Sequence, residues 1–222
     1  MEIILSQRQS EMKERIVAML DGTLPGWSSQ MPLSPIGHTI HPPTPSDARE
    51  AAVNLLLKPN AETDSYTMIY IKRGTKYGAD QHKGQISFAG GKRESTDETL
   101  LDCAIRETEE EIGIKRDKIK VLGALSPFYV FISGFIVYPY VAIVPAGTQY
   151  QIDPDEVDYV VEVELDHLLD PNTLKYRPHN FKGKKIEKSP YFHIGGDEIL
   201  WGATAMMTNE FLSLLRLGDD GA

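Results

Sequence analysis

Apolar residues recur along the chain in two patterns, one at helical spacing and one in short strand-like runs. Residues 9–20 carry apolar side chains at helical spacing, and the Asp21-Gly22 pair that follows is typical of a helix end. We expect this amphipathic helix either to pack on the rest of the protein or to contact a second copy of the chain. Five prolines between residues 32 and 45 exclude a regular helix or a central strand there.

The remainder of the chain alternates short apolar runs with a few longer helical patterns. Runs bounded by turn-forming residues predict strands at 51–57, 67–71, 85–88, 119–125, 135–144 and 159–163. Helices are expected at 96–112, 166–169 and 204–216. Strands interleaved with few helices are typical of a layered α/β or α+β domain.

These patterns divide the chain into three parts. Residues 1–45 are interpreted as an N-terminal helix followed by a proline-rich extension, residues 46–217 as one domain, and residues 218–222 as a disordered tail. A chain of 222 residues is long enough for one sizeable hydrophobic core.

Composition excludes several classes of protein. Hydrophobic residues make up 41% and charged residues 25%, which excludes a wholly disordered or fibrous chain. A net charge of −9 argues against a general nucleic-acid binder. The single cysteine, Cys103, excludes an intrachain disulfide and fits a reducing compartment. Residues 1–14 do not resemble a signal peptide, and no apolar run reaches the ~18–20 residues of a membrane span. We therefore expect a cytoplasmic protein that binds neither nucleic acid nor membrane.

Charge is unevenly distributed in the middle of the chain. Residues 72–93 carry a net charge of +5, and residues 94–111, which follow directly, carry −7. The first segment suits phosphate groups and the second suits divalent cations. An enzyme that uses a metal ion to cleave a phosphate ester or anhydride needs both.

The acidic segment places three carboxylates on one helix face. Glu107, Glu110 and Glu111 stand at i, i+3 and i+4, whereas Glu109 points away from them. Such carboxylates repel one another unless a cation lies between them, and oxygen-rich clusters suit Mg²⁺ or Mn²⁺. On spacing alone, an exposed acidic helix surface remains the alternative.

The same segment resembles the Nudix box, the signature of hydrolases that cleave diphosphates linked to another group. The match consists of Gly91, an acid at Glu98 and the run Arg106-Glu107-Thr108-Glu109-Glu110-Glu111-Ile112-Gly113-Ile114. The general box has five residues between the glycine and the first acid, so this sequence carries one extra. If Asp97 is the first acid instead, the spacing from Gly91 is the usual one, but the spacing from that acid to Arg106 is longer. The one-residue expansion resembles the coenzyme A diphosphatase branch of the family.

Other segments resemble the same branch. Residues 82–91 are similar to its "HxGQ(I/V)SFPGG" motif, with Ala89 in place of the usual proline. Residues 133–139, 154–157 and 199–205 are similar to its later landmarks. The loop over residues 74–81 is longer than is usual in the branch.

The resemblance implies a fold and an activity. The fold would be the Nudix fold, a mixed β-sheet between helices. The activity would be that of a metal-dependent diphosphatase converting coenzyme A (CoA), or its derivatives, into 4′-phosphopantetheine or its acyl form and 3′,5′-ADP. The alternatives are a Nudix pyrophosphatase acting on ADP-ribose, dinucleotides or nucleoside triphosphates, and a non-catalytic Nudix-fold binding or regulatory domain. The partner implied is a small-molecule diphosphate, and a homodimer is left open.

The resemblance also implies roles for individual residues. Glu107, Glu110 and Glu111 would hold Mg²⁺ or Mn²⁺, and Arg106 would orient the preceding loop through an ion pair, with Asp102 as its i−4 neighbour. The substrate contacts would come from the loop before the helix; the candidates are Arg73, His82, Lys83, Gly90 and Gly91.

The sequence also raises the question of whether a few other residues take part in the site. Glu156 is either a general base reaching across the site or an ordinary turn carboxylate. Cys103 has no accompanying base or second cysteine and is expected to pack in the interior. Trp201 and the pair Met206-Met207 are also expected in the core.

Overall fold

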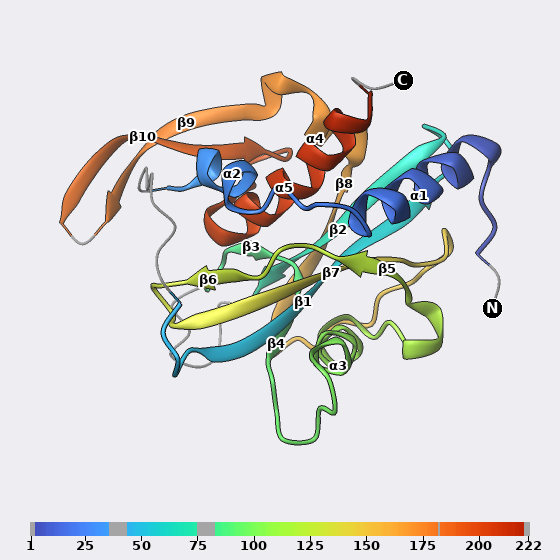
Figure 1. Cartoon of the computed structure of the whole chain (residues 1–222), viewed down its shortest axis with the longest axis horizontal. Helices are drawn as coiled ribbons and strands as arrows, with labels where there is room; N and C mark the ends of the chain where they lie inside the picture. Colours follow the sequence, from blue (N-terminus) through green and yellow to red (C-terminus); the bar gives the residue numbers. More distant parts are fainter. Residues whose placement is uncertain (1–2, 36–43, 75–82, 182, 220–222) are drawn as a thin grey trace.

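The computed structural model describes residues 3–35, 44–74, 83–181 and 183–219. A mixed sheet runs through the middle of the molecule (Figure 1), with the central strand order β3-β2-β1-β7-β5. Strands β4, β6 and β8 pair with β1, β7 and β2, respectively. The strands are β1 (Arg49–Asn60), β2 (Ser65–Arg73), β3 (Ile86–Ser87), β4 (Ala89–Lys92), β5 (Lys120–Ala124), β6 (Phe128–Val130), β7 (Phe135–Ile143) and β8 (Val157–Glu164). The pairing of β1 with β7 is parallel and the other pairings are antiparallel, which makes the sheet mixed.

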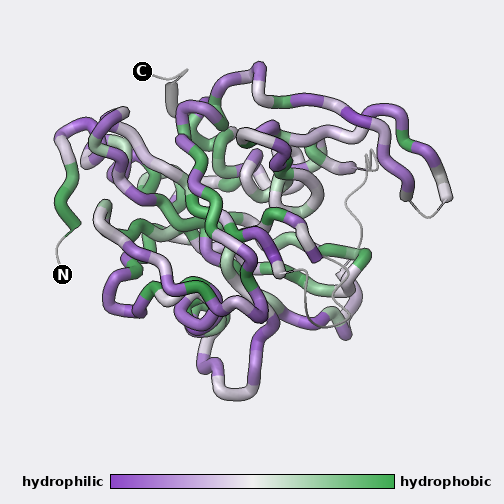
Figure 2. Tube along the Cα trace, turned by 180° about the vertical axis from the view of Figure 1, so that it is seen from behind, coloured by the Kyte–Doolittle hydropathy of each residue, from purple (hydrophilic) through white to green (hydrophobic). Residues whose placement is uncertain are grey.

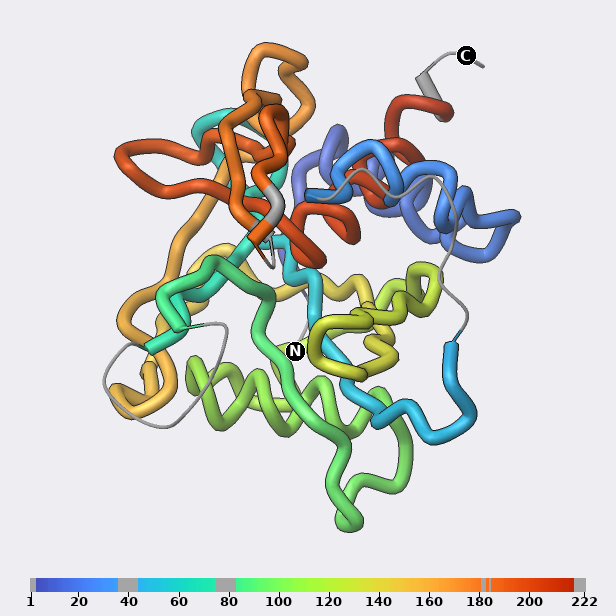
Figure 3. The backbone as a smooth tube through the Cα atoms, turned by 90° about the vertical axis from the view of Figure 1, so that its left-hand side faces the viewer, coloured from blue at the N-terminus to red at the C-terminus, as the bar shows by residue number. Residues whose placement is uncertain are grey.

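Helices cover both faces of this sheet. Helix α3 lies against one face, and α1, α2 and α5 lie on the other (Figures 1 and 3). The helices are α1 (Gln7–Leu20), α2 (Trp27–Gln30), α3 (Leu100–Ile112), α4 (Leu165–Leu169) and α5 (Gly202–Asp219). The predicted sheet between helices is therefore confirmed. Among the described residues, none of the helices combines the length and the apolar composition needed to cross a membrane.

Apolar clusters fill the spaces between the layers. The largest joins α1 and α5 to the sheet and includes Ile16, Tyr70 and Phe211, which are all almost fully buried. A smaller cluster around Ile112 and Leu56 joins α3 to the opposite face. Strand residues are buried on both faces because helices cover both, which explains the continuous apolar runs in the sequence.

Helix α3 begins four residues later than its predicted start at residue 96. Residues 94–97 form a turn, in which the backbone N–H of Glu94 donates to the Asp97 carboxylate at 2.8 Å. Thr99 is the N-cap and forms a reciprocal capping box with Asp102. At the other end Gly113 takes the left-handed conformation, with φ 72°, that ends a helix. The caps fix where the acidic residues fall around the helix.

A carboxylate holds the N-terminal part of the chain to α5. Glu210 is fully buried and accepts hydrogen bonds from Gln30 Nε2 at 2.7 Å, the backbone N–H of Gly26 at 3.1 Å and that of Ser126 at 3.3 Å. Neutral donors thus satisfy a charge that burial would otherwise penalise.

A second sheet was not predicted from the sequence. Strands β9 (Leu174–Phe181) and β10 (Lys184–His193) form a hairpin, and β11 (Ile199–Trp201) pairs with β10. The hairpin projects from the rest of the molecule (Figure 1), and much of it is polar (Figure 2). Lysines, prolines and histidines interrupt the apolar alternation that identifies a strand, so the sequence pattern was weak here.

Candidate active site

Three carboxylates from separate parts of the sequence meet beside the main sheet. Glu107 and Glu111 come from α3, and Glu156 immediately precedes β8. One ligand oxygen from each lies within 4.8 Å of the other two. Glu111 is buried, Glu107 is half-buried and Glu156 is exposed. They meet because α3 packs against β4 and because the turn before β8 is held near the end of β2. In that turn the Glu156 carbonyl accepts a hydrogen bond at 2.7 Å from the N–H of Gly74, the residue after β2.

Glu111 is the most deeply placed of the three. Its side chain is only 1% exposed, and its Oε2 accepts a hydrogen bond from the Gly90 N–H at 2.8 Å. Its Oε1 lies 3.7 Å from Nη1 of Arg73. Burial raises the pKa of Glu111 to about 8, against the lowering effects of the Gly90 N–H and the Arg73 charge. A cation beside it would remove that penalty and keep the carboxylate ionised.

The two glycines of β4 allow the helix to approach the strand. A Cβ added at Gly91 would lie 2.5 Å from the Glu107 carboxyl carbon, so only a glycine leaves room for that carboxylate. A Cβ at Gly90 would lie 2.3 Å from the backbone oxygen of Ala52 on β1, and Gly90 also has φ 150°. The two glycines are thus required for different reasons. Gly91 leaves space for the Glu107 carboxylate, and Gly90 leaves space for the backbone of β1.

Arg106 holds the acidic loop and the carboxylate helix together. Its guanidinium donates to both oxygens of Asp97, through Nε at 2.9 Å and Nη2 at 3.0 Å. It also contacts Glu107 at 3.0 Å and the Lys92 carbonyl at 3.2 Å. Hydrogen bonds from Arg106 are the main reason why the pKa of Asp97 falls to about 2. Its predicted ion pair with the loop is present, but the partner is Asp97.

Asp102, the neighbour named from the sequence, has other partners. Its carboxylate closes the capping box with Thr99 and pairs with Arg116 at 2.8 Å. Asp97 is therefore the loop acid that pairs with the helix arginine, whereas the side chain of Glu98 forms no described contact with Arg106. The turn over residues 94–97 accommodates the shifted spacing.

Glu110 lies apart from the three-carboxylate cluster. Its side chain is 56% exposed and pairs with Nη1 of Arg106 at 2.7 Å. The Glu107–Glu111 pair points to β4, whereas Glu110 lies further round the helix on the side of Arg106. The structure thus brings together two of the three predicted metal ligands and adds Glu156, which the sequence left ambiguous.

The comparisons with known proteins identify the family. A NUDIX domain profile matches residues 48–186, more than half of the chain. The protein belongs to the Nudix family. The predictions of this membership, of the mixed fold and of a hydrolase are confirmed.

Individual relatives agree with this assignment. The chain is 33% identical over 152 residues to the mouse mitochondrial coenzyme A diphosphatase NUDT8, covering 68% of this chain and 71% of that protein. It is 32% identical over 138 residues to the uncharacterized Nudix hydrolase NudL of Pectobacterium atrosepticum, covering 61% and 70%. A MutT/nudix family protein from Enterococcus faecalis shares the fold at a TM-score of 0.50 and 16% identity, covering 97% of this chain and 76% of that one.

The Nudix carboxylates lie in a cavity of about 410 Å³. Arg73, Gly90 and Gly91, which are among the candidates for substrate contacts, line it together with all three clustered carboxylates. Of the other candidates, Lys83 is described but is not among the lining residues, and His82 lies outside the described residues. The charged lining of the cavity thus combines three carboxylates with two cations, Arg73 and Lys92.

Another part of the Nudix cavity is largely apolar. Trp201, predicted in the core, is only half-buried and lines this cavity, as does the buried Met207. A smaller apolar cavity of about 90 Å³ adjoins it and shares Gln85, Val130 and Trp201 with it. The sequence feature that could have placed Trp201 at the cavity was its position in the motif over residues 199–205. A tryptophan that lines a site need not be fully buried.

Cys103 packs as predicted, one turn before Glu107. Its side chain is fully buried, with Sγ 3.6 Å from the Gly91 carbonyl. Burial raises the pKa of the thiol to about 12, so it is not a nucleophile near neutral pH.

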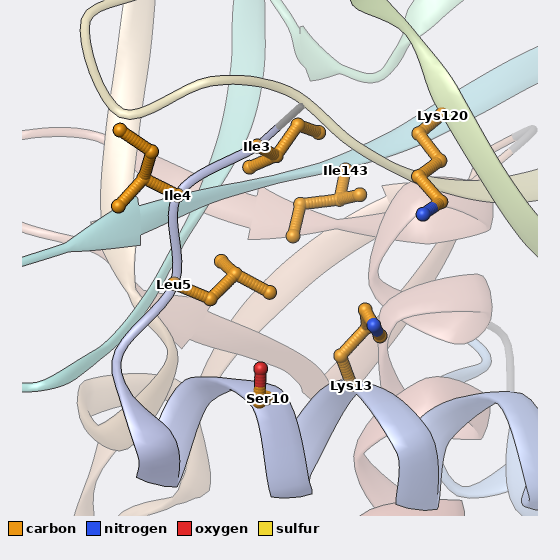
Figure 4. A pocket seen from close by; sticks show the side chains of 7 residues that line it. All are labelled: Ile3, Ile4, Leu5, Ser10, Lys13, Lys120 and Ile143. Carbon is orange, nitrogen blue, oxygen red and sulfur yellow. The ribbon is translucent and has the colours of Figure 1, made fainter. Parts of the chain in front are cut away.

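A further cavity, of about 480 Å³, lies between the N-terminal segment, α1 and the main sheet. Ile3 and Leu5 of the N-terminal segment line it together with Lys13 of α1 and Lys120 of β5 (Figure 4). None of the clustered carboxylates lines it. The cavity that holds the carboxylates is therefore the candidate active site.

Proposed function

We propose that this Nudix hydrolase is a Mg²⁺- or Mn²⁺-dependent diphosphatase of coenzyme A or its derivatives. The observation that carries the proposal is the cluster of Glu107, Glu111 and Glu156 in a cavity that also presents Arg73. The products would be 4′-phosphopantetheine, or its acyl form, and 3′,5′-ADP.

The donor set fits a hard divalent cation. All three clustered side chains offer carboxylate oxygens, which such a cation prefers. Because Gly91 has no side chain, the Glu107 carboxylate can lie against β4. When bound, the cation would neutralise diphosphate oxygens and lower the pKa of an attacking water. Glu110 is proposed as an additional ligand, which requires that Arg106 release it.

The remaining residues would bind and orient the substrate. Arg73 lies at the wall of the cavity, where its guanidinium can pair with a diphosphate oxygen as well as with Glu111. Arg106 is bound by three carboxylates and would act by fixing Glu107 and the loop over residues 92–97. Glu156, the most exposed of the cluster, is placed to accept a proton from water if it does not bind the cation.

Two observations favour coenzyme A among the diphosphates. A relative with a named activity, at 33% identity, is a coenzyme A diphosphatase. In addition, the cavity continues into an apolar pocket of about 90 Å³, which suits an uncharged moiety joined to the diphosphate. A nucleoside triphosphate carries an uncharged moiety on only one side of its phosphates, whereas CoA carries one on each side of its diphosphate.

A substrate panel tests the proposal. The purified protein is incubated with Mg²⁺ and, separately, with CoA, acetyl-CoA, ADP-ribose, NADH or ATP, and the products are identified by mass spectrometry. We expect 3′,5′-ADP from CoA and acetyl-CoA, and no turnover in EDTA. Hydrolysis of ADP-ribose without hydrolysis of either CoA compound would overturn the substrate assignment. Turnover of CoA in EDTA would overturn the metal requirement.

A further inference from the structure

The hairpin of β9 and β10 is a basic part of an acidic protein. Residues 174–193 contain six lysines or arginines and one glutamate, although the whole chain has a net charge of −9. Because the hairpin lies outside the main sheet, this charge is not needed to form the domain core. A cluster of exposed cations of this kind is suited to binding an anion.

Strand alternation gathers part of this charge on one face. Lys175, Arg177 and His179 are separated by two residues each along β9, so their side chains share a face. Lys175 pairs across the ladder with Tyr191 of β10, and Tyr191 pairs in turn with Trp201 of β11. Residues directly opposite each other lie on the same face, so the basic residues share a face with Trp201.

The opposite face of this sheet belongs to the core. Phe192 of β10 and Leu200 of β11, the next residues along each strand, are buried in the main apolar cluster. Beside β11 the basic face is therefore the exposed one, whereas further along the hairpin the opposite face is exposed as well, with Tyr176 58% exposed.

Side-chain contacts connect this face to the candidate active site. The Arg177 guanidinium carbon lies 5.6 Å from the Trp201 ring centroid and 5.8 Å from that of Tyr191. The His179 and Trp201 rings are 4.9 Å apart. Trp201 in turn lines the cavity that contains Glu107 and Glu111. One aromatic ring therefore separates the basic groups from the carboxylate cavity.

Arg177 has no carboxylate partner among the residues that the structure describes. By contrast, Lys185 near the hairpin tip pairs with Glu187 at 2.9 Å. Arg177 is held by aromatic rings, which leave its five N–H donors for an external anion. Arginine donors match the geometry of phosphate oxygens.

We propose that the face formed by Lys175, Arg177 and His179 binds a phosphomonoester of the substrate that lies outside the scissile diphosphate. This inference rests on the proposed function. In CoA that group is the 3′-phosphate of the ribose, adjacent to the diphosphate. The face thereby makes the enzyme distinguish CoA from 3′-dephospho-CoA.

A comparison of two substrates in three proteins tests the assignment. Wild type, Arg177→Gln and Lys185→Gln are assayed with CoA and with 3′-dephospho-CoA. Lys185 pairs with Asn180 across the ladder, so it lies on the other face of the same hairpin and is a matched control. A charged hydrogen bond contributes about 1.5–3 kcal/mol, which corresponds to roughly 10- to 100-fold in affinity.

The expected result is specific to one substrate and one variant. In Arg177→Gln, kcat/KM for CoA falls at least about tenfold, mainly through KM, while that for dephospho-CoA stays within about twofold. Lys185→Gln behaves as wild type. Equal turnover of both substrates by wild type, or an equal loss in both hairpin variants, would overturn the inference. Circular dichroism and thermal unfolding verify that each variant is folded, and Arg177→Lys, which keeps the charge, is expected to recover part of the loss.

Binding of nucleotide products separates this inference from the proposed function. Titration calorimetry compares adenosine 3′,5′-bisphosphate with 5′-AMP. Tighter binding of the bisphosphate, lost in Arg177→Gln, supports the inference even if the protein does not hydrolyse CoA. Equal binding of the two nucleotides contradicts it. Tight binding of a short RNA by wild type, abolished in both hairpin variants, would instead indicate a nucleic-acid surface and also contradict it.

Discussion

The carboxylate cluster lines the cavity, whereas Trp201 separates the basic hairpin face from it, and the two regions are built differently. Glu107 and Glu111 are fixed by one helix packed on the main sheet, with a backbone N–H on Glu111. Arg177 is positioned by the register of strands outside that sheet and touches only aromatic rings among its described contacts. The first region therefore depends on the packing of a helix on the main sheet, whereas the second depends on strand pairing outside that sheet. We therefore expect changes in the cluster to reduce turnover of every substrate, and changes in the hairpin to alter preference among substrates.

The largest effect is expected from Glu111→Gln. Glutamine retains the volume and an acceptor for the Gly90 N–H, but it removes the most buried charge of the cluster. We expect kcat to fall by roughly 10³-fold for CoA and dephospho-CoA alike, with the thermal unfolding temperature unchanged or higher. Glu109→Gln is the matched control, since Glu109 pairs with Lys115 away from the cluster. Near-normal turnover in Glu111→Gln would refute the metal-site assignment.

The two glycines of β4 are expected to separate folding from function. Gly91→Ala meets the Glu107 carboxylate, the flexible end of a side chain, so the protein should fold while losing roughly 10- to 100-fold in kcat. Gly90→Ala meets the β1 backbone, and we expect a loss of roughly 3 kcal/mol or more in unfolding free energy. Chemical denaturation measures the second effect and steady-state kinetics the first. Identical losses of stability in both variants would show that Gly91 has no specific relation to Glu107.

Asp97→Asn is expected to have the smallest effect. Asparagine keeps one acceptor oxygen, so the variant loses the carboxylate charge and one of the two hydrogen bonds to Arg106, which should lower the unfolding free energy at pH 7 by about 1–2 kcal/mol. The folded pKa of Asp97 is about 2, below the usual 3.8, so its contribution is present above pH 4 and is lost as the pH falls toward 2. The difference between wild type and variant should therefore vanish over that interval.

Denaturation of both proteins at several pH values measures this difference. Glu98→Gln, which changes the other acid that the motif spacing allows, serves as the control and should match wild type throughout. A constant difference for Asp97→Asn down to pH 2 would show that the ion pair does not stabilise the fold.

Sequence periodicity was sufficient to place the helical part of the site. Glu107 and Glu111 share a helix face because of their i, i+4 spacing, and this follows from the sequence alone. The same rule placed Glu110 with them, but it could not show that Arg106 would compete for that carboxylate. Nor could spacing decide between Asp97 and Glu98, since the answer depends on a turn before the helix.

The parts of the site that depend on distant segments were not predictable in this way. Glu156 joins the cluster because of the pairing of β2 with β8, and a lone turn carboxylate carries no sign of that. The basic face requires the register of three strands, including a bulge between Ile186 and Ser189. A shift of one residue would place Arg177 on the other face. Local spacing therefore predicts the carboxylates better than it predicts the surface beside them.

The buried carboxylate of Glu210 bears on where a functional fragment of this chain can begin. The family match covers residues 48–186, yet Gln30 and Gly26 donate to Glu210 from one side of that interval, and α5 carries it on the other. A fragment cut to the matched segment would lose α1, α2 and α5, which lie on one face of the sheet. A fragment that lacked only the first 35 residues would keep a buried anion with two of its three donors removed. The smallest autonomous unit is therefore larger than the stretch by which the family is recognised.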